Sequence, residues 1–225
     1  MTAHVVGVDI CLRGWLAASI TLDVPKKPRF ALFADLAQLA AHYPDAAVIA
    51  VDIPIGLGDG VRRADRAAAD FIGGRRSSVF AMPSRAVMEA GTHELAVQLS
   101  RERGHAAPSI QAYGLRAKIF EAEAVAGHDQ RVIEVHPEVT FRAMAGQPLP
   151  HGKKSWNGAM DRRALLAAGG IGIQHDLGDA GKAPIDDVLD ACAAAWSARR
   201  YARGEAVPLP DPPEKVAGRD VAIWF

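Results

Sequence analysis

Several acidic residues, far apart in the chain, have the chemistry and the spacing of metal ligands. Asp187 and Asp190 lie in a stretch from Pro184 to Trp196 whose proline start and alanine-rich continuation predict a helix. Their separation of three residues projects both carboxylates from one face of that helix. Asp186 shares the face of Asp190 equally well, although an acidic residue in the first turn also complements the helix dipole.

Other carboxylates lie near the ends of predicted strands. The apolar runs His4 to Ile10 and Ala47 to Ile53 each predict a buried strand with an aspartate, Asp9 or Asp52, near its end. Glu134 lies toward the end of a third such run. A carboxylate in this position is costly to bury unless it is paired or bound to a cation. Because ligand sites of open α/β sheets lie at the carboxyl ends of strands, we expect these side chains to meet at one edge.

Together these carboxylates predict a site for hard divalent cations. Concentrated carboxylates repel one another and shift their pKa values unless cations neutralise them. Oxygen ligands suit Mg²⁺ or Mn²⁺, and the sequence has no His/Cys spacing for zinc. Two such ions about 4 Å apart can activate a water and stabilise the leaving oxygen in phosphodiester cleavage. The predicted catalytic and metal-binding residues are Asp9, Asp52, Glu134, Asp187 and Asp190. His136 and Glu138, beside a predicted helix start, stay open between capping, core and ligand roles.

Side chains that suit a phosphate group gather in two further stretches. Six arginines lie between Val61 and Arg85 against two aspartates, and part of this run is a Gly- and Ser-rich loop. Arginine matches phosphate in a bidentate manner, but solvated arginines on a helix face explain such a run equally well. The predicted substrate-binding residues are Arg75, Arg76, Ser77, Ser78, Arg85, Lys153 and Lys154. For the two lysines, simple solvation is the competing interpretation.

The surrounding pattern predicts an α/β fold with a mixed sheet. Three consecutive strands, at 4–10, 14–21 and 29–33, form an antiparallel meander, and a helix at 36–42 leads to the fourth strand. A helical crossover favours a parallel neighbour for that strand. Helices at 62–72, 94–103 and 109–126 form a helical insertion, at about 57–128, in a single domain of residues 1–225. The remaining predicted elements are a strand at 131–135, helices at 137–145, 160–168 and 184–204, an extended proline-rich tail from 207, and a short strand or edge cover at 221–225.

Bulk composition is that of an ordinary globular protein, with 49% hydrophobic and 23% charged residues. The formal net charge of zero argues against non-specific coating of long nucleic acid. No apolar run approaches the roughly 18 residues that span a bilayer, and the start of the chain lacks a signal-peptide pattern. Cys11 and Cys192 make no disulfide framework. We therefore expect a cytoplasmic protein with no membrane partner.

The order of the acids resembles the RNase H-like superfamily: aspartate on the first strand, aspartate on the fourth, an acid on a later strand and Asp-x-x-Asp-Ala on the final helix. The last motif is most similar to the Holliday-junction resolvase branch. More closely, the whole chain resembles domain-of-unknown-function family 429, usually described as predicted nucleases with an RNase H fold. The matching stretches are Gly7–Asp9 with Gly14-Trp15, Val51–Gly56, Arg75–Phe80 with Pro83–Arg85, Glu134–Glu138, Lys153-Lys154 and Asp186–Ala191. Ile10 departs from the glycine that the family more often shows beside the first aspartate.

This resemblance implies an RNase H-like fold. It also implies the activity that is common in that superfamily, a Mg²⁺- or Mn²⁺-dependent nuclease or phosphodiesterase. Near-neutral charge favours a short, structured or small nucleotide-like substrate over a long duplex. Because one fold hosts many functions, two alternatives stay open. One is a catalytically inactive RNase H-like binding module, and the other is an actin-like small-molecule kinase, which normally needs two such halves. A homo-oligomer is also open.

Overall fold

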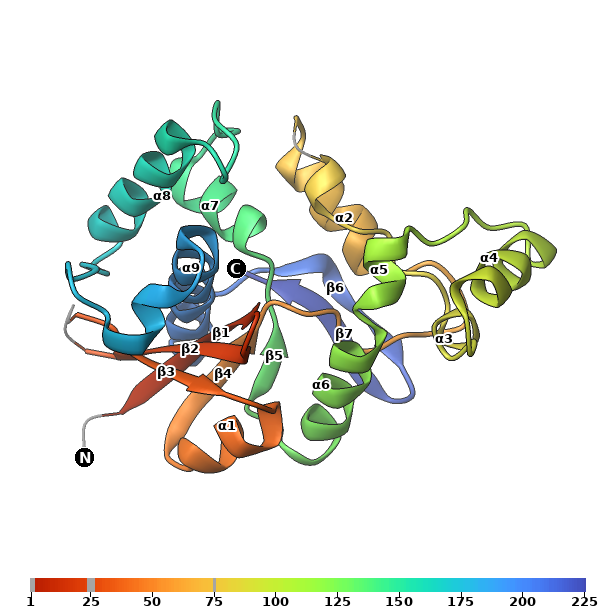
Figure 1. Ribbon diagram of the computed structural model, residues 1–225, viewed down its shortest axis with the longest axis horizontal. Helices are drawn as coiled ribbons and strands as arrows, with labels where there is room; N and C mark the ends of the chain where they lie inside the picture. Colours follow the sequence, from red (N-terminus) through yellow and green to blue (C-terminus); the bar gives the residue numbers. More distant parts are fainter. Residues whose placement is uncertain (1–2, 24–26, 75) are drawn as a thin grey trace.

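A five-stranded mixed sheet forms the centre of the fold (Figure 1). The computed structural model describes residues 3–23, 27–74 and 76–225. The strand order is β3-β2-β1-β4-β5, with the bounds β1 His4–Cys11, β2 Gly14–Thr21, β3 Arg29–Phe33, β4 Ala46–Val51 and β5 Val132–Glu134. β1 to β3 are antiparallel neighbours, whereas β4 is parallel to β1 and β5 is parallel to β4. The predicted α/β class, the meander and the parallel fourth strand are therefore confirmed.

Helices cover both faces of this sheet (Figure 1). Successive strand residues point to opposite faces, so Val5 packs with one core and Val6 with the other. On the first face lie α7 Pro137–Ala145, α8 Trp156–Ala168 and α9 Ile185–Ala202. On the second face lie α1 Leu36–His42 and α6 Arg116–His128.

The contact between α9 and β1 is a close backbone approach. A Cβ atom added to Gly7 would lie 2.0 Å from the backbone nitrogen of Ala195 and 2.2 Å from the carbonyl oxygen of Ala191. The helix face that meets β1 consists of small side chains, and residues 191–195 are all buried. Glycine on the strand and alanines on the helix thus allow α9 to lie directly against the sheet.

The segment between β4 and β5 is helical, as predicted. It holds α2 Arg63–Ile72, α3 Arg85–Met88, α4 His93–Glu102, α5 Ile110–Gly114 and α6. The single helix predicted over 109–126 is wrong, because Leu115, with a ψ of −8°, forms a tight turn between α5 and α6. α8 also begins earlier than predicted, at Trp156, because the Ser155 hydroxyl caps it by accepting from the Gly158 amide.

The proline-rich tail is extended, as predicted, and forms a second, two-stranded antiparallel sheet. Its strands are β6 Pro208–Val216 and β7 Arg219–Trp224. The Arg219 guanidinium donates to the carbonyls of Val132, 2.9 Å away, and Ala126, which ties this hairpin to β5 and α6. Among the described residues, no helix combines the length and the apolar character that crossing a membrane requires.

Candidate active site

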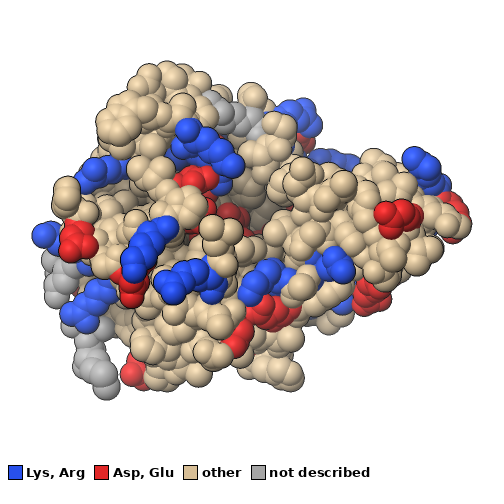
Figure 2. Space-filling model, in the orientation of Figure 1, with Lys and Arg blue, Asp and Glu red and all other residues tan. Residues whose placement is uncertain are grey.

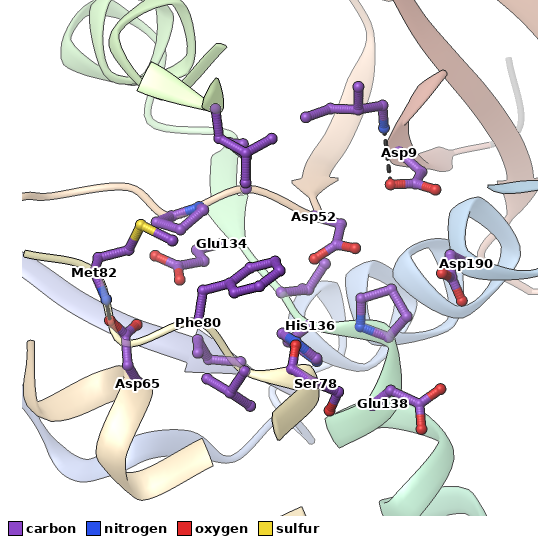
Figure 3. A pocket seen from close by; sticks show the side chains of 18 of the residues that line it. Asp9, Asp52, Asp65, Ser78, Phe80, Met82, Glu134, His136, Glu138 and Asp190 are labelled. Atoms are coloured by element: carbon purple, nitrogen blue, oxygen red, sulfur yellow. Dashed lines mark hydrogen bonds between the residues drawn. The ribbon is translucent and has the colours of Figure 1, made fainter. Parts of the chain in front are cut away.

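Carboxylates from β1, the end of β4 and the start of α9 line one cavity of about 600 Å³. Asp9 lies in β1, and Asp52 follows the last residue of β4, where its amide donates to the Val8 carbonyl at 2.9 Å. Asp190 lies in the second turn of α9. Figure 3 shows these three side chains gathered on one side of the cavity. In the space-filling view, acidic atoms are visible inside a hollow near the middle of the face, with lysine and arginine side chains around it (Figure 2).

Asp187 also lines the cavity, whereas Asp186, one position earlier, is not part of the lining. Helix α9 therefore places Asp187 and Asp190, which are three residues apart, on the cavity wall. This is the first of the two pairings that the sequence left open. Partial burial, followed by the neighbouring charge of Asp186, raises the pKa of Asp187. The sequence pattern left this choice open, and the helix orientation set by β1 decides it.

Burial dominates the electrostatics of this cluster. Asp9 and Asp190 are only 8% and 1% exposed. Loss of hydration raises the pKa of Asp9, and the charges of Asp52 and Asp190 raise it further. Loss of hydration also raises the pKa of Asp52 and of Asp190 to about 7 each, despite the opposing charge of Lys153. The carboxylates therefore lack the positive charge that would hold all of them ionised at neutral pH.

Lys153 is the one lysine or arginine on the cavity wall within the described residues. Its Nζ atom lies 2.6 Å from Oδ2 of Asp190. Burial opposes its charge, but Asp190, Asp52 and Asp9 outweigh this effect and raise the pKa of the ammonium group. The other oxygen of Asp190, Oδ1, is buried and has no hydrogen-bond partner. Seven carboxylates share the same wall: Asp9, Asp52, Asp65, Glu134, Glu138, Asp187 and Asp190.

Glu134 lines the cavity but is paired elsewhere. Its Oε2 atom accepts from the Ile55 amide at 2.7 Å and forms an ion pair with Arg62. Arg62 is 2% exposed and also binds Asp65 at 2.7 Å, whose second oxygen accepts from the Met82 amide at 2.7 Å. The sequence places Arg62 in a basic run, so its burial was not foreseen. The spacing of three between Arg62 and Asp65 is the signal that indicates their pairing.

The predicted substrate-binding residues divide between the cavity and the outer surface. Ser77, Ser78 and Lys153 line the cavity. Arg76 is exposed and pairs with Asp70 at 3.0 Å. Arg85 pairs with Glu123 at 2.6 Å and lines a separate cavity of about 780 Å³ beside β7. Lys154 is exposed, but it is close enough to Asp187 to lower the pKa of that carboxylate. Arg75 lies outside the described residues.

The two residues left open, His136 and Glu138, both line the cavity. Glu138 is buried and makes a bidentate pair with Arg162, with distances of 2.6 and 2.8 Å to its two oxygens. His136 Nε2 lies 3.2 Å from the Ser78 carbonyl, and its Nδ1 atom is buried without a partner. Burial lowers the pKa of His136, which favours the neutral ring. The cavity also has apolar wall residues, among them Phe80 and Met82, that the site prediction did not include.

The donors suit a hard divalent cation, although they do not form a closed cage. In the described part of the chain, no three His, Cys, Asp or Glu side chains converge in an arrangement that could hold a metal ion as it stands. Asp9, Asp52 and Asp190 nevertheless supply oxygen donors in excess negative charge, and Asp190 Oδ1 has an unused lone pair. Glu134 fits this role less well, since Arg62 and a backbone amide already hold its Oε2 atom.

The chain matches the model of a protein family. No curated protein and no solved structure matches the chain. Residues 7–215 match the sequence model of a family described as "Protein of unknown function (DUF429)". The match covers most of the chain and includes every predicted site residue. The chain belongs to this family, DUF429.

Proposed function

We propose that this protein is a metal-dependent phosphodiester hydrolase with an RNase H-like arrangement, acting on nucleic acid or a nucleotide-like substrate. One observation carries the proposal. Asp190 is 1% exposed and keeps an unpartnered oxygen, Oδ1, in a cavity that it shares with the buried carboxylate of Asp9 and the half-buried carboxylate of Asp52. A buried carboxylate oxygen without a partner is costly, so it supports a role for Oδ1 as a ligand of a cation.

The sheet topology supports the same reading. Three antiparallel strands followed by two parallel ones, in the order β3-β2-β1-β4-β5, agree with the RNase H-like arrangement that the sequence resemblance implies. The acids also come from the elements that this resemblance names: the first strand, the end of the fourth strand, a later strand, which carries Glu134, and the final long helix. Fold alone does not fix activity, so the proposal depends on the carboxylate cluster.

Each side chain of the site has a role in this proposal. Asp9, Asp52, Asp187 and Asp190 would hold Mg²⁺ or Mn²⁺, which, when bound, acts as a Lewis acid and activates water. Lys153 fixes the orientation of Asp190 and offsets part of the negative charge around the substrate phosphate. Ser77 and Ser78, which also line the cavity, would supply hydroxyl groups to the phosphate oxygens. Hydrolysis then joins the water oxygen to phosphorus, breaks one P–O ester bond and leaves a proton on the departing oxygen.

The test combines metal binding with cleavage. Thermal unfolding would be followed in EDTA, Mg²⁺ and Mn²⁺, and cleavage would be measured on single strands, duplexes, RNA–DNA hybrids, four-way junctions and dinucleotides. We expect metal-dependent stabilisation and cleavage in the wild type and the loss of both in Asp9→Asn. The matched control is Asp186→Asn, which changes an acid outside the cavity and should keep both. Full cleavage by Asp9→Asn would overturn the proposal, and metal binding without any cleavage would favour the binding module.

A further inference from the structure

The cavity has a second, apolar wall beside the carboxylates. We name it the apolar wall and define it by Ile53, Pro54, Phe80, Met82 and Leu115, all of which line the cavity. Ile53 and Met82 are 2% and 1% exposed and belong to the hydrophobic core. The cavity therefore combines carboxylates, including Glu134 and Asp65 close to Met82 (Figure 3), with apolar surface that phosphate chemistry does not use.

Phe80 differs from the rest of this wall because its side chain is 43% exposed. It belongs to none of the hydrophobic clusters in the described part of the chain. Figure 3 shows its ring extending from the loop between α2 and α3 toward Asp52. An aromatic face left in water is stabilised when a planar, apolar group covers it. The ring is thus placed to contact a ligand that also reaches the carboxylates.

The loop that carries Phe80 is anchored on both sides. The Met82 amide donates to Asp65 at 2.7 Å, and the Ser78 carbonyl lies 3.2 Å from His136 Nε2. Asp65 is itself held by Arg62, which also pairs with Glu134 on β5. Hydrogen bonds therefore hold the backbone on both sides of Phe80 before any ligand binds, as in most small-molecule sites.

Cavity size and charge define the class of ligand. A volume of about 600 Å³ lies within the range of small-molecule sites, roughly 300–1,000 Å³. Among the described residues, the cavity wall itself carries one lysine, so these residues provide no row of cations inside the cavity with which to follow a polyanionic backbone. Stacking on an aromatic ring suits a nucleobase, since every base has a π face. We infer that Phe80 forms a nucleobase subsite, so that one nucleotide unit binds with its base on Phe80 and its phosphoester at Asp9, Asp52 and Asp190.

This inference rests on the proposed function, but its test does not need turnover. Binding of adenosine 5′-monophosphate and of ribose 5-phosphate, which carries a hydroxyl group in place of the adenine, would be measured by calorimetry in Mn²⁺. We expect the nucleotide to bind roughly 5- to 150-fold more tightly, the equivalent of about 1–3 kcal/mol for one stacked base. Phe80→Leu should remove most of this difference and leave ribose 5-phosphate binding unchanged, while Phe80→Tyr should retain it. Trp156→Leu removes an aromatic side chain that is 75% exposed outside the cavity and serves as the matched control.

Equal affinity of the wild type for the two ligands, no binding of either ligand, or an unchanged difference in Phe80→Leu would overturn the base subsite. The two proposals fail separately. Base discrimination without any metal-dependent cleavage would support the subsite and reject the hydrolase. Cleavage that is lost in Asp9→Asn, with no base discrimination, would do the reverse. If a linear six-nucleotide strand competes with adenosine 5′-monophosphate and a circular strand does not, the subsite binds the terminal nucleotide of a strand. If neither strand competes, the subsite binds free nucleotides.

Discussion

Lys153 donates from Nζ to Oδ2 of Asp190 at 2.6 Å, and this ion pair joins the loop before α8 to the second turn of α9. The two partners differ in exposure, since the Lys153 side chain is 38% exposed and that of Asp190 is 1% exposed. The ammonium group of Lys153 therefore has access to solvent, whereas the carboxylate of Asp190 lies inside the fold. We expect the Lys153 ammonium group and a metal ion to compete for the buried carboxylate of Asp190.

Lys153→Met should weaken the metal-free fold and strengthen metal binding. The substitution leaves Asp190 buried without a positive partner. We expect a loss of about 1–3 kcal/mol in the free energy of unfolding in EDTA, less than the 3–5 kcal/mol of a fully buried pair because Lys153 is partly exposed. Removing one positive charge from the site should raise Mn²⁺ affinity at pH 8 on the order of tenfold. Urea unfolding and calorimetry measure the two effects, with the exposed Lys154→Met as control. Unchanged metal affinity would show that Lys153 does not compete.

Stability and metal affinity should depend on pH in opposite directions. Burial raises the pKa of Asp52 to about 7 from its ordinary 3.8, so between those values the folded protein holds a proton that the unfolded chain has released. The free energy of unfolding in EDTA should therefore receive from Asp52 a contribution that falls as pH rises through this window. Metal affinity should rise over the same range, with a slope of about one log unit per pH unit for each displaced proton. Asp52→Asn removes the titration of Asp52 together with its effect on the pKa of Asp9, and identical pH profiles of stability for the variant and the wild type would contradict the prediction.

Asp9→Asn should stabilise the metal-free protein while it removes metal binding. Asparagine keeps an oxygen that accepts the Ile10 amide, a bond of 2.8 Å in the structure, but it removes a buried charge that Asp52 and Asp190 repel. We expect a gain of about 1 kcal/mol in EDTA by loss of this repulsion. The measurement is thermal unfolding with and without Mn²⁺. A variant that loses stability in EDTA would show that the charge of Asp9 has a structural partner.

Arg62→Met should be strongly destabilising, because it leaves Glu134 and Asp65 buried with no cation. We expect a loss of about 3–5 kcal/mol in urea unfolding. Arg63→Met, one position later on an exposed side chain, is the matched control and should change stability by no more than about 0.5 kcal/mol.

Glu134→Gln tests the predicted ligand role of Glu134 directly. A large loss of metal affinity would support that role, and lost stability with unchanged metal affinity would assign Glu134 to the ion pairs of Arg62.

The carboxylates that gather in the cavity were predictable because local pattern and topology suffice to place them. Asp9 and Asp52 lie near the ends of apolar runs, and parallel strands bring those ends to one edge of the sheet. The helical spacing of Asp187 and Asp190 then presents both to the same side. These inferences need no knowledge of side-chain partners.

Partners from distant segments were not predictable in the same way. Arg62 reaches Glu134 across 72 positions, and Lys153 reaches Asp190 across 37. Neither pairing has a periodic signature, since each depends on how a loop crosses the sheet edge. The position of Phe80 likewise follows from the bond between Asp65 and the Met82 amide, which sequence pattern does not encode.

The contact between Gly7 and the alanines of α9 has a consequence for divergence within the family. Because backbone meets backbone there, the approach of β1, which carries Asp9, to α9, which carries Asp190, leaves no room for a side chain at position 7. A relative can exchange large core residues elsewhere and keep this geometry, but one added methyl group at position 7 displaces the helix and its two carboxylates together. Small residues at positions 7, 191 and 195 therefore indicate that a relative has kept the close packing of β1 against α9, even where the acids themselves have been replaced.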